Sequence, residues 1–250
     1  MGSTLGQLGV FMPVSLTSPV SADRQREIAR TLERDGYRTV WTNEVVGGKD
    51  AFVQLAVLMA ATERLVFGTG IANMWAREPQ HMHAAAAQLA DAFPDRFVLG
   101  IGVGYPQQAA GTGREYGRPL ATLRDYVRRM DDQAAPPAPP APPAPDVSYP
   151  RILGANGPRM TALAGEIADG SLPAGQPPEF TAGARKTLGP DKLLVVAMAV
   201  TLGTEAGEVE ANLKQHLVAG ADHVILMPPM DADSADCMAY WRELAPRLND

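Results

Sequence analysis

One stretch in the first half of the chain constrains the fold more than any other. Two apolar runs rich in β-branched residues, 65–71 and 97–103, enclose a single segment with helical character. This pattern is typical of a βαβ unit, in which a crossover helix joins two parallel strands. Gly70, Gly102 and Gly104 stand near the carboxyl ends of these runs. Ligands approach parallel strands at those ends, so the glycines are candidate contacts for a planar ligand, although each alone could serve only a tight turn.

Apolar runs with strand character alternate with amphipathic segments along the whole chain. We expect strands at residues 8–14, 38–45, 65–71, 96–102, 151–154, 170–173, 193–202 and 223–227. We expect a helix after each of them, at residues 22–35, 50–62, 79–93, 119–133, 158–168, 179–188, 205–219 and 238–248. Eight strand–helix units in 250 residues predict an α/β fold, a single (β/α)₈ TIM barrel over residues 1–250. A Rossmann-like sheet would instead place a GxGxxG turn after the first strand, where the sequence reads PVSLTSPVS.

A tract rich in proline and alanine, residues 134–146, separates the fourth expected helix from the fifth expected strand. Proline lacks a backbone N–H, so the tract favours polyproline II and predicts a semi-rigid linker. A docking role for an SH3-like partner is the less favoured alternative. A domain boundary is disfavoured, because neither side alone would close a barrel.

Composition excludes several classes of function. The net charge is −6 and there is no basic block, so we expect no nucleic-acid partner. Cys237 is the single cysteine, which excludes an internal disulfide and favours a reducing, cytoplasmic location. No export signal and no run of 18 apolar residues is present, so we expect no membrane span. His81 and His83 are two residues apart at a helix start and would face different directions, and we expect no metal site.

Two further stretches are candidate sites. Glu44 ends the second expected strand, where its carboxylate could orient a cofactor, act as an acid or base, or only cap the next loop. The sequence Gly154-Ala155-Asn156-Gly157-Pro158 joins the fifth strand to a helix, and a helix N-terminus favours a phosphate. A plain helix start is an equally good interpretation of that turn. The sequence contains no nucleophile elbow, Walker loop or HExxH motif, so demanding chemistry would need a cofactor and a small-molecule substrate.

The chain resembles the luciferase-like monooxygenase superfamily, in particular its branch dependent on the deazaflavin coenzyme F420. The resemblance rests on GYRTVWTNEV, LVFGTGIANMWAREP, DRFVLGIGVGY and PRILGANGPRMTALAGEIADG, with AGADHVILMP similar to the family's last strand. It implies a (β/α)₈ barrel with the cofactor ring at the carboxyl-terminal mouth. It also implies a non-proline cis peptide, which here would be the Gly70–Ile71 bond. The residues that match the family's cofactor contacts are Glu44, Gly70, Ile71, Asn73, Gly102, Gly104, Gly154, Ala155, Asn156, Gly157 and Pro158.

The chain also departs from the family pattern. Val45 stands where several F420-dependent members carry a histidine that acts as a proton carrier, and the segment between the last two strands is shorter than in relatives. The resemblance implies an F420-dependent oxidoreductase that transfers a hydride between the deazaflavin and a small organic substrate, with Glu44 as the candidate catalytic residue. The shorter segment implies a more open site or a different substrate. One alternative is an FMN-dependent monooxygenase that needs a partner flavin reductase, and another is a non-catalytic flavin-binding barrel. The resemblance further implies a homodimer.

Overall fold

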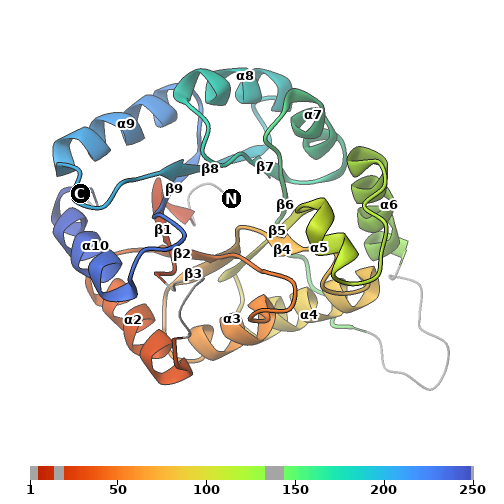
Figure 1. Cartoon of the computed structure of the whole chain (residues 1–250), viewed down its shortest axis with the longest axis horizontal. Helices are drawn as coiled ribbons and strands as arrows, with labels where there is room; N and C mark the ends of the chain where they lie inside the picture. The colour runs from red at the N-terminus through yellow and green to blue at the C-terminus, as the bar shows by residue number, and fades with distance from the viewer. Residues whose placement is uncertain (1–4, 14–19, 133–143, 249–250) are drawn as a thin grey trace.

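In the computed structural model, parallel strands close into a barrel that helices surround (Figure 1). The structure describes residues 5–13, 20–132 and 144–248. Pairing of β1 with β9 and of β3 with β5 closes the ring, and every pair is parallel. This confirms the predicted (β/α)₈ barrel. The strands of the ring are β1 (Leu8–Phe11), β2 (Thr39–Thr42), β3 (Val66–Thr69), β5 (Phe97–Gly102), β6 (Arg151–Gly154), β7 (Gly170–Leu172), β8 (Leu193–Ala199) and β9 (His223–Met227).

The outer layer consists of helices that follow the strands. Local signals in the sequence fix where these helices begin: the side chain of Asp50 accepts a hydrogen bond from the N–H of Val53 at 3.0 Å, and proline occupies the first turn of several others. Apolar side chains on their inner faces pack against the outside of the barrel. The outer helices are α2 (Ala22–Arg34), α3 (Ala51–Met59), α4 (Pro79–Ala92), α6 (Pro119–Asp131), α7 (Pro158–Ile167), α8 (Pro178–Leu188), α9 (Ala206–Val218) and α10 (Ser234–Leu248).

Some predicted boundaries are wrong. The last helix begins at Ser234 and not at residue 238, because Asp233 accepts a hydrogen bond from the N–H of Ala235 at 2.7 Å and so starts the helix earlier. The strand expected at 38–45 ends at Thr42, since the N–H of Glu44 donates to Ile71 and not to the adjacent strand ladder. The end of the strand expected at 8–14 lies partly outside the described residues.

Two elements were not predicted. After β3, the chain forms a two-residue strand, β4 (Ala72–Asn73), which pairs with the end of β5. After β5, it forms a five-residue helix, α5 (Pro106–Ala110). Both are too short to show a period in the sequence, and both lie at the carboxyl ends of the strands.

Trp41 and His223 form a buried polar pair inside the barrel. Nε1 of Trp41 donates to Nε2 of His223 at 3.1 Å, so the ring proton of His223 is on Nδ1, which lies 2.8 Å from the carbonyl oxygen of Gly6. Gly68 makes room for this pair, because a Cβ there would lie 2.3 Å from Cε3 of Trp41. Burial lowers the pKa of His223 to about 4, and the histidine is therefore a neutral packing residue.

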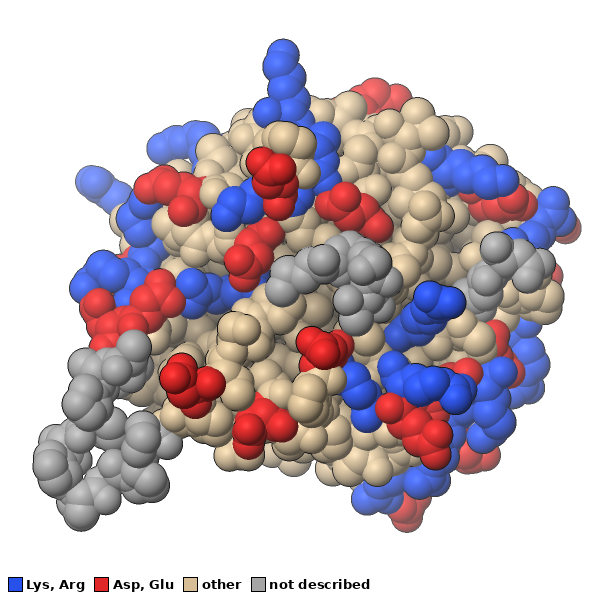
Figure 2. All heavy atoms as spheres, turned by 180° about the vertical axis from the view of Figure 1, so that it is seen from behind, with Lys and Arg blue, Asp and Glu red and all other residues tan. Residues whose placement is uncertain are grey.

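Most of the predicted linker, residues 134–143, lies outside the described residues. The strands on either side of it, β5 and β6, pair with each other in the same barrel. Figure 2 shows Lys and Arg interspersed with Asp and Glu on the back face. Of the helices in the described ranges, none is both long and apolar enough to cross a membrane.

Candidate cofactor site at the carboxyl ends of the strands

A buried ion pair forms the base of the site. Glu44, which is 5% exposed, receives two hydrogen bonds from Arg77, at 2.5 Å to Oε1 and 3.1 Å to Oε2. The N–H of Asn73 donates to Oε2 at 2.9 Å and the N–H of Ala51 donates to Oε1 at 3.3 Å. Arg77 also pairs with Asp50 at 2.8 Å. Four donors occupy the carboxylate, so the geometry supports a positioning role for Glu44, which joins the end of β2 to β4 and to the start of α3.

The segment between β3 and β4 carries the clearest ligand-binding feature. The Gly70–Ile71 bond is a non-proline cis peptide, as the resemblance implies. Asn73, which is 1% exposed, follows it, and its Oδ1 accepts a hydrogen bond from the N–H of Trp75 at 3.0 Å. Its amide nitrogen Nδ2 is buried and has no hydrogen-bond partner in the described structure. Buried donors are nearly always paired, so this amide is suited to donate to a ligand.

Two predicted glycines lie next to this amide. A Cβ at Gly102 would lie 2.6 Å from Cγ1 of Ile71, so a side chain there would displace Ile71. Gly104 has a φ of +55°, and a Cβ there would lie 2.1 Å from Oε1 of Gln108 and 2.7 Å from Nδ2 of Asn73. At both positions the absence of a side chain lets neighbouring groups pack directly against the backbone at the end of β5.

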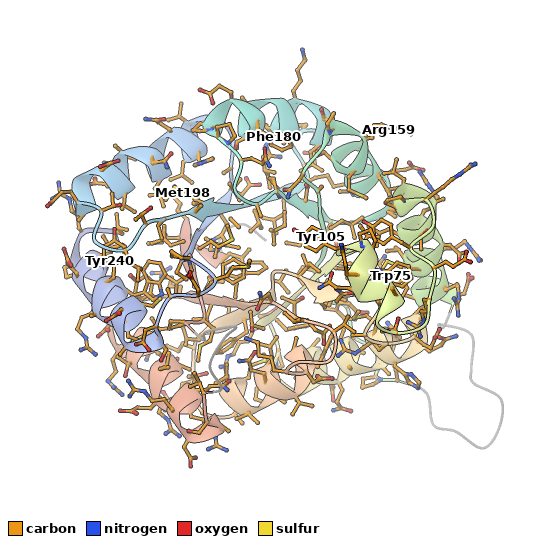
Figure 3. All side chains as sticks on the ribbon, in the orientation of Figure 1. Trp75, Tyr105, Arg159, Phe180, Met198 and Tyr240 are labelled. Carbon is orange, nitrogen blue, oxygen red and sulfur yellow. The ribbon has the colours of Figure 1, made fainter. Side chains whose placement is uncertain are left out.

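Aromatic side chains form a wall beside these glycines, and Figure 3 shows Trp75 and Tyr105 close to α5. Nε1 of Trp75 donates to the carbonyl oxygen of Val103 at 2.7 Å, and the hydroxyl of Tyr116 donates to that of Gly104 at 2.9 Å. The rings of Trp75 and Tyr116 are 6.0 Å apart. Sequence reasoning missed Tyr116, which follows the unpredicted α5.

The predicted phosphate turn borders the same place. A Cβ at Gly154 would lie 3.2 Å from Cγ2 of Ile71 and 3.8 Å from Cα of Gly102, which places the end of β6 beside the cis peptide. Helix α7 then begins without a side-chain cap, and a Cβ at Gly157 would meet nothing within 4 Å. Arg159 in its first turn is exposed (Figure 3). The helix N-terminus is therefore open to an anion.

Two other residues of this turn have different roles. Oδ1 of Asn156 accepts a hydrogen bond from the N–H of Ala174 at 2.8 Å, and the N–H of Ala155 donates to Leu172 at 3.1 Å. These bonds tie the turn to the end of β7. The structure thus brings all the predicted contact residues to one end of the barrel, with Ala155 and Asn156 shaping the turn.

One candidate residue was missed by sequence reasoning. The amine Nζ of Lys49, in the loop between β2 and α3, is buried and has no hydrogen-bond partner among the described residues. Burial lowers the pKa of this amine to about 8. The sequence places a lysine after two glycines, but no signal in it shows that the amine is buried.

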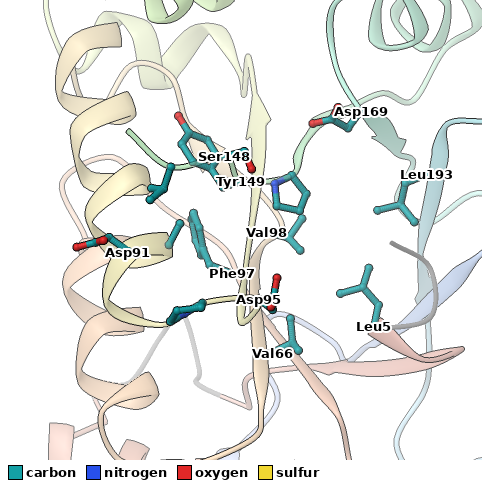
Figure 4. A pocket seen from close by; sticks show the side chains of 14 residues that line it. Leu5, Val66, Asp91, Asp95, Phe97, Val98, Ser148, Tyr149, Asp169 and Leu193 are labelled. Atoms are coloured by element: carbon teal, nitrogen blue, oxygen red, sulfur yellow. The ribbon is translucent and has the colours of Figure 1, made fainter. Parts of the chain in front are cut away.

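A cavity of about 490 Å³ opens at the opposite end of the barrel (Figure 4). Val66, Phe97 and Leu193, which lie at the amino ends of their strands, are among the residues that line it. In Figure 4, Phe97 and Tyr149 lie on one side of it and Leu5 and Leu193 on the other. This cavity is therefore separate from the predicted cofactor site. Within the described ranges, no group of three or more His, Cys, Asp or Glu side chains could hold a metal ion.

Comparisons with known proteins show which family the chain resembles. The model of the luciferase-like monooxygenase family matches residues 7–190. A Mycobacterium tuberculosis protein named as a coenzyme F420-dependent oxidoreductase is 31% identical over 173 residues, 59% of this chain and 50% of that protein. The 5,10-methylenetetrahydromethanopterin reductase of Methanolobus tindarius is 26% identical over 222 residues, 79% of this chain and 68% of that one. The chain thus spans half the length of the first relative and about two thirds of the second.

Solved structures share the fold. An F420-dependent secondary alcohol dehydrogenase, in complex with an F420–acetone adduct, superposes with a TM-score of 0.75 at 18% identity, over 98% of this chain and 99% of that chain. A monooxygenase of Streptomyces bottropensis superposes with a TM-score of 0.72 at 15% identity, over 97% and 98% of the two chains. At these identities the two structures show the fold alone.

The barrel and the polar, glycine-lined mouth are those of a cofactor-dependent α/β enzyme. The match of the family model over well more than half of the chain makes the assignment specific. The chain belongs to the luciferase-like monooxygenase family, a family of oxidoreductases that depend on F420 or a flavin.

Proposed function

We propose that this protein is an F420-dependent oxidoreductase that transfers a hydride between the deazaflavin and a small organic substrate. The observation that carries the proposal is the unpartnered amide of Asn73, which lies beside the side-chain-free end of β5. An amide N–H₂ at this point can donate to the polar edge of a heterocycle. The Mycobacterium relative, named as F420-dependent, supports the choice of deazaflavin over FMN.

The residues present fit a ring with an anionic tail. Gly102 and Gly104 add no side chain to the end of β5, so Ile71 and Asn73 form the surface that a flat ring would meet there. The uncapped start of α7 at Gly157 and the cation of Arg159 suit a phosphate on that tail. When bound, the deazaflavin supplies or accepts a hydride at its C5 carbon. The protein's own part is to hold the ring and the substrate at reacting distance.

Glu44 acts indirectly in this proposal. Its carboxylate accepts hydrogen bonds from the N–H of Asn73 and from Nη1 and Nη2 of Arg77. It thereby fixes the backbone that carries the amide donor. A direct proton-transfer role for Glu44 stays a prediction. The homodimer also stays a prediction.

A side-by-side titration of the purified protein with F420 and FMN, in both redox states, tests the proposal. Cofactor fluorescence reports binding, and we expect tight binding of F420 and weak binding of FMN. A preference for FMN, with oxygen consumed in the presence of reduced flavin, would move the assignment to a monooxygenase. Binding of neither cofactor would favour a non-catalytic barrel.

A further inference from the structure

Lys49 differs from the other lysines of the chain. The chain has four, at positions 49, 186, 192 and 214. Lys214 pairs with Glu210 at 2.5 Å, Lys192 donates to the carbonyl oxygen of Ala168 at 2.7 Å, and Lys186 is exposed to water. The amine of Lys49 is buried and has no such partner in the described structure. An unpaired buried ammonium is costly, so its presence calls for a ligand that pairs with it.

The carboxylates nearest in sequence are committed elsewhere. Asp50 caps α3 through Val53 and accepts a hydrogen bond from Arg77 at 2.8 Å. Glu44, at the other end of the same loop, is occupied by Arg77 and by two backbone N–H groups. Both carboxylates of this loop therefore pair with Arg77, and neither pairs with Lys49.

This loop borders the proposed ring site. It leaves the carboxyl end of β2 at Glu44, whose carboxylate binds the N–H of Asn73. Gly47, two residues before Lys49, has a φ of +80° and open space around it. The lysine side chain has a long, flexible stem. A rotation of that side chain can bring the amine to a ligand at the mouth.

Apolar side chains are exposed around the same end of the barrel. Val45 (38% exposed), Tyr105 (70%) and Met230 (71%) lie on the loops that follow β2, β5 and β9. Exposed apolar side chains on these loops favour an apolar ligand surface. The loops at the mouth therefore carry exposed apolar side chains as well as the unpaired amine of Lys49.

We propose that Lys49 binds a carboxylate of the substrate, and that the substrate of this site is an amphipathic acid with an apolar body. The inference rests on the proposed function, because it takes the mouth as the substrate site. A carboxylate next to the amine would favour its charged form, which burial alone disfavours. The charge-assisted hydrogen bond would fix the orientation of the substrate.

Nuclear magnetic resonance of the protein labelled with ¹³C at the lysine Cε atoms tests this inference, because only four side-chain signals arise. Octanoate serves as the carboxylate probe and 1-octanol as its uncharged match, each added with and without cofactor. We expect octanoate to move the Lys49 signal and to leave that of Lys186 in place, and we expect no movement with 1-octanol. K49M should weaken octanoate binding about tenfold or more, while K49R and the surface control K186M should retain it.

Four outcomes would overturn the inference. The inference is wrong if octanoate binds without moving the Lys49 signal, if K49M binds octanoate as tightly as the unchanged protein does, or if octanoate does not bind at all. Movement of the Lys49 signal with F420 or FMN alone would assign the cation to the cofactor instead. If neither cofactor binds, the proposed function fails, whereas the octanoate titration of the cofactor-free protein still decides the role of Lys49.

Discussion

The buried polar pair inside the barrel differs from two buried polar groups at the carboxyl-terminal mouth in whether the groups have hydrogen-bond partners. Inside the barrel, Trp41 and His223 satisfy each other, and the second nitrogen of His223 pairs with Gly6. At the mouth, Nδ2 of Asn73 and Nζ of Lys49 have no partner among the described residues. Paired polar groups stabilise a single packing, whereas unpaired ones raise the free energy of the protein until a ligand binds.

Position matters as much as the lack of a partner. Arg151, Ser171 and Trp241 also carry buried side-chain atoms without a partner in the described structure. None of these three lies on the loops at the carboxyl ends of the strands. An unpaired atom indicates a ligand most clearly at the end of the barrel where ligands approach parallel strands.

The largest expected effect concerns the ion pair of Glu44 and Arg77 at the base of the mouth. E44Q removes the charge that pairs with the largely buried Arg77, and we expect the free energy of unfolding to fall by about 3 kcal/mol. D50N is the matched control, because Asp50 is more exposed and asparagine caps a helix as well as aspartate does. We expect it to cost about 1 kcal/mol or less. Denaturant unfolding measures both, and equal losses would show that the Glu44 pair is not the base of the site.

The next effect tests the inside of the barrel. The pKa of His223 is about 4 in the folded protein and about 6.5 when unfolded, so the unfolded chain binds the extra proton first as the pH falls. Stability should therefore decrease as the pH falls from about 6.5 towards 4, by about 3 kcal/mol in total from this residue. H223Q should lose that part of the pH dependence. The same slope in H223Q and the unchanged protein would contradict this assignment.

A negative charge at the start of α7 should weaken cofactor binding, and the change in free energy should be slightly smaller than the two above. G157D places a carboxylate at the expected phosphate position, in space that is open, so the fold should tolerate it. We expect the Kd for F420 to rise about 100-fold, and G157A, which adds size without charge, to change it little. Fluorescence titration gives both constants. An unchanged Kd in G157D would place the phosphate elsewhere.

The smallest effect isolates the amide of Asn73. N73D keeps the Oδ1 acceptor of the Trp75 N–H but replaces the unpartnered donor with an acceptor. We expect about tenfold weaker F420 binding together with a lower thermal midpoint, because the new carboxylate is buried without a cation. Unfolding and titration of the same preparation separate the two quantities. A loss of stability without a loss of affinity would assign Asn73 to the fold.

The sequence predicted the barrel because each strand and outer helix is long enough to show its own period. The strands at Arg151–Gly154 and His223–Met227 have the predicted bounds. β4 and α5 were missed because two and five residues give only about one repeat of the strand or helix period, which is too little to recognise in a sequence. The contacts of Glu44 were also missed, since Arg77 is 33 positions away in the sequence.

The candidate site was predictable where it depends on glycine. Gly102, Gly104 and Gly154 stand at strand ends in the sequence, and the parallel barrel brings those ends together. The state of Lys49 was not predictable, because burial and the lack of a partner arise only when the whole loop is folded. Sequence pattern therefore located the mouth, and the structure showed which of its polar groups are free to bind.

The most direct test of this account follows the side-chain amide of Asn73 by ¹⁵N NMR during titration with F420, with N73D used to assign the signal. We predict that the Asn73 side-chain signal moves on F420 binding, while the ring signals of His223 inside the barrel stay in place. If F420 binds and the Asn73 signal does not move, the unpartnered amide is not a cofactor contact, and the proposed site is wrong.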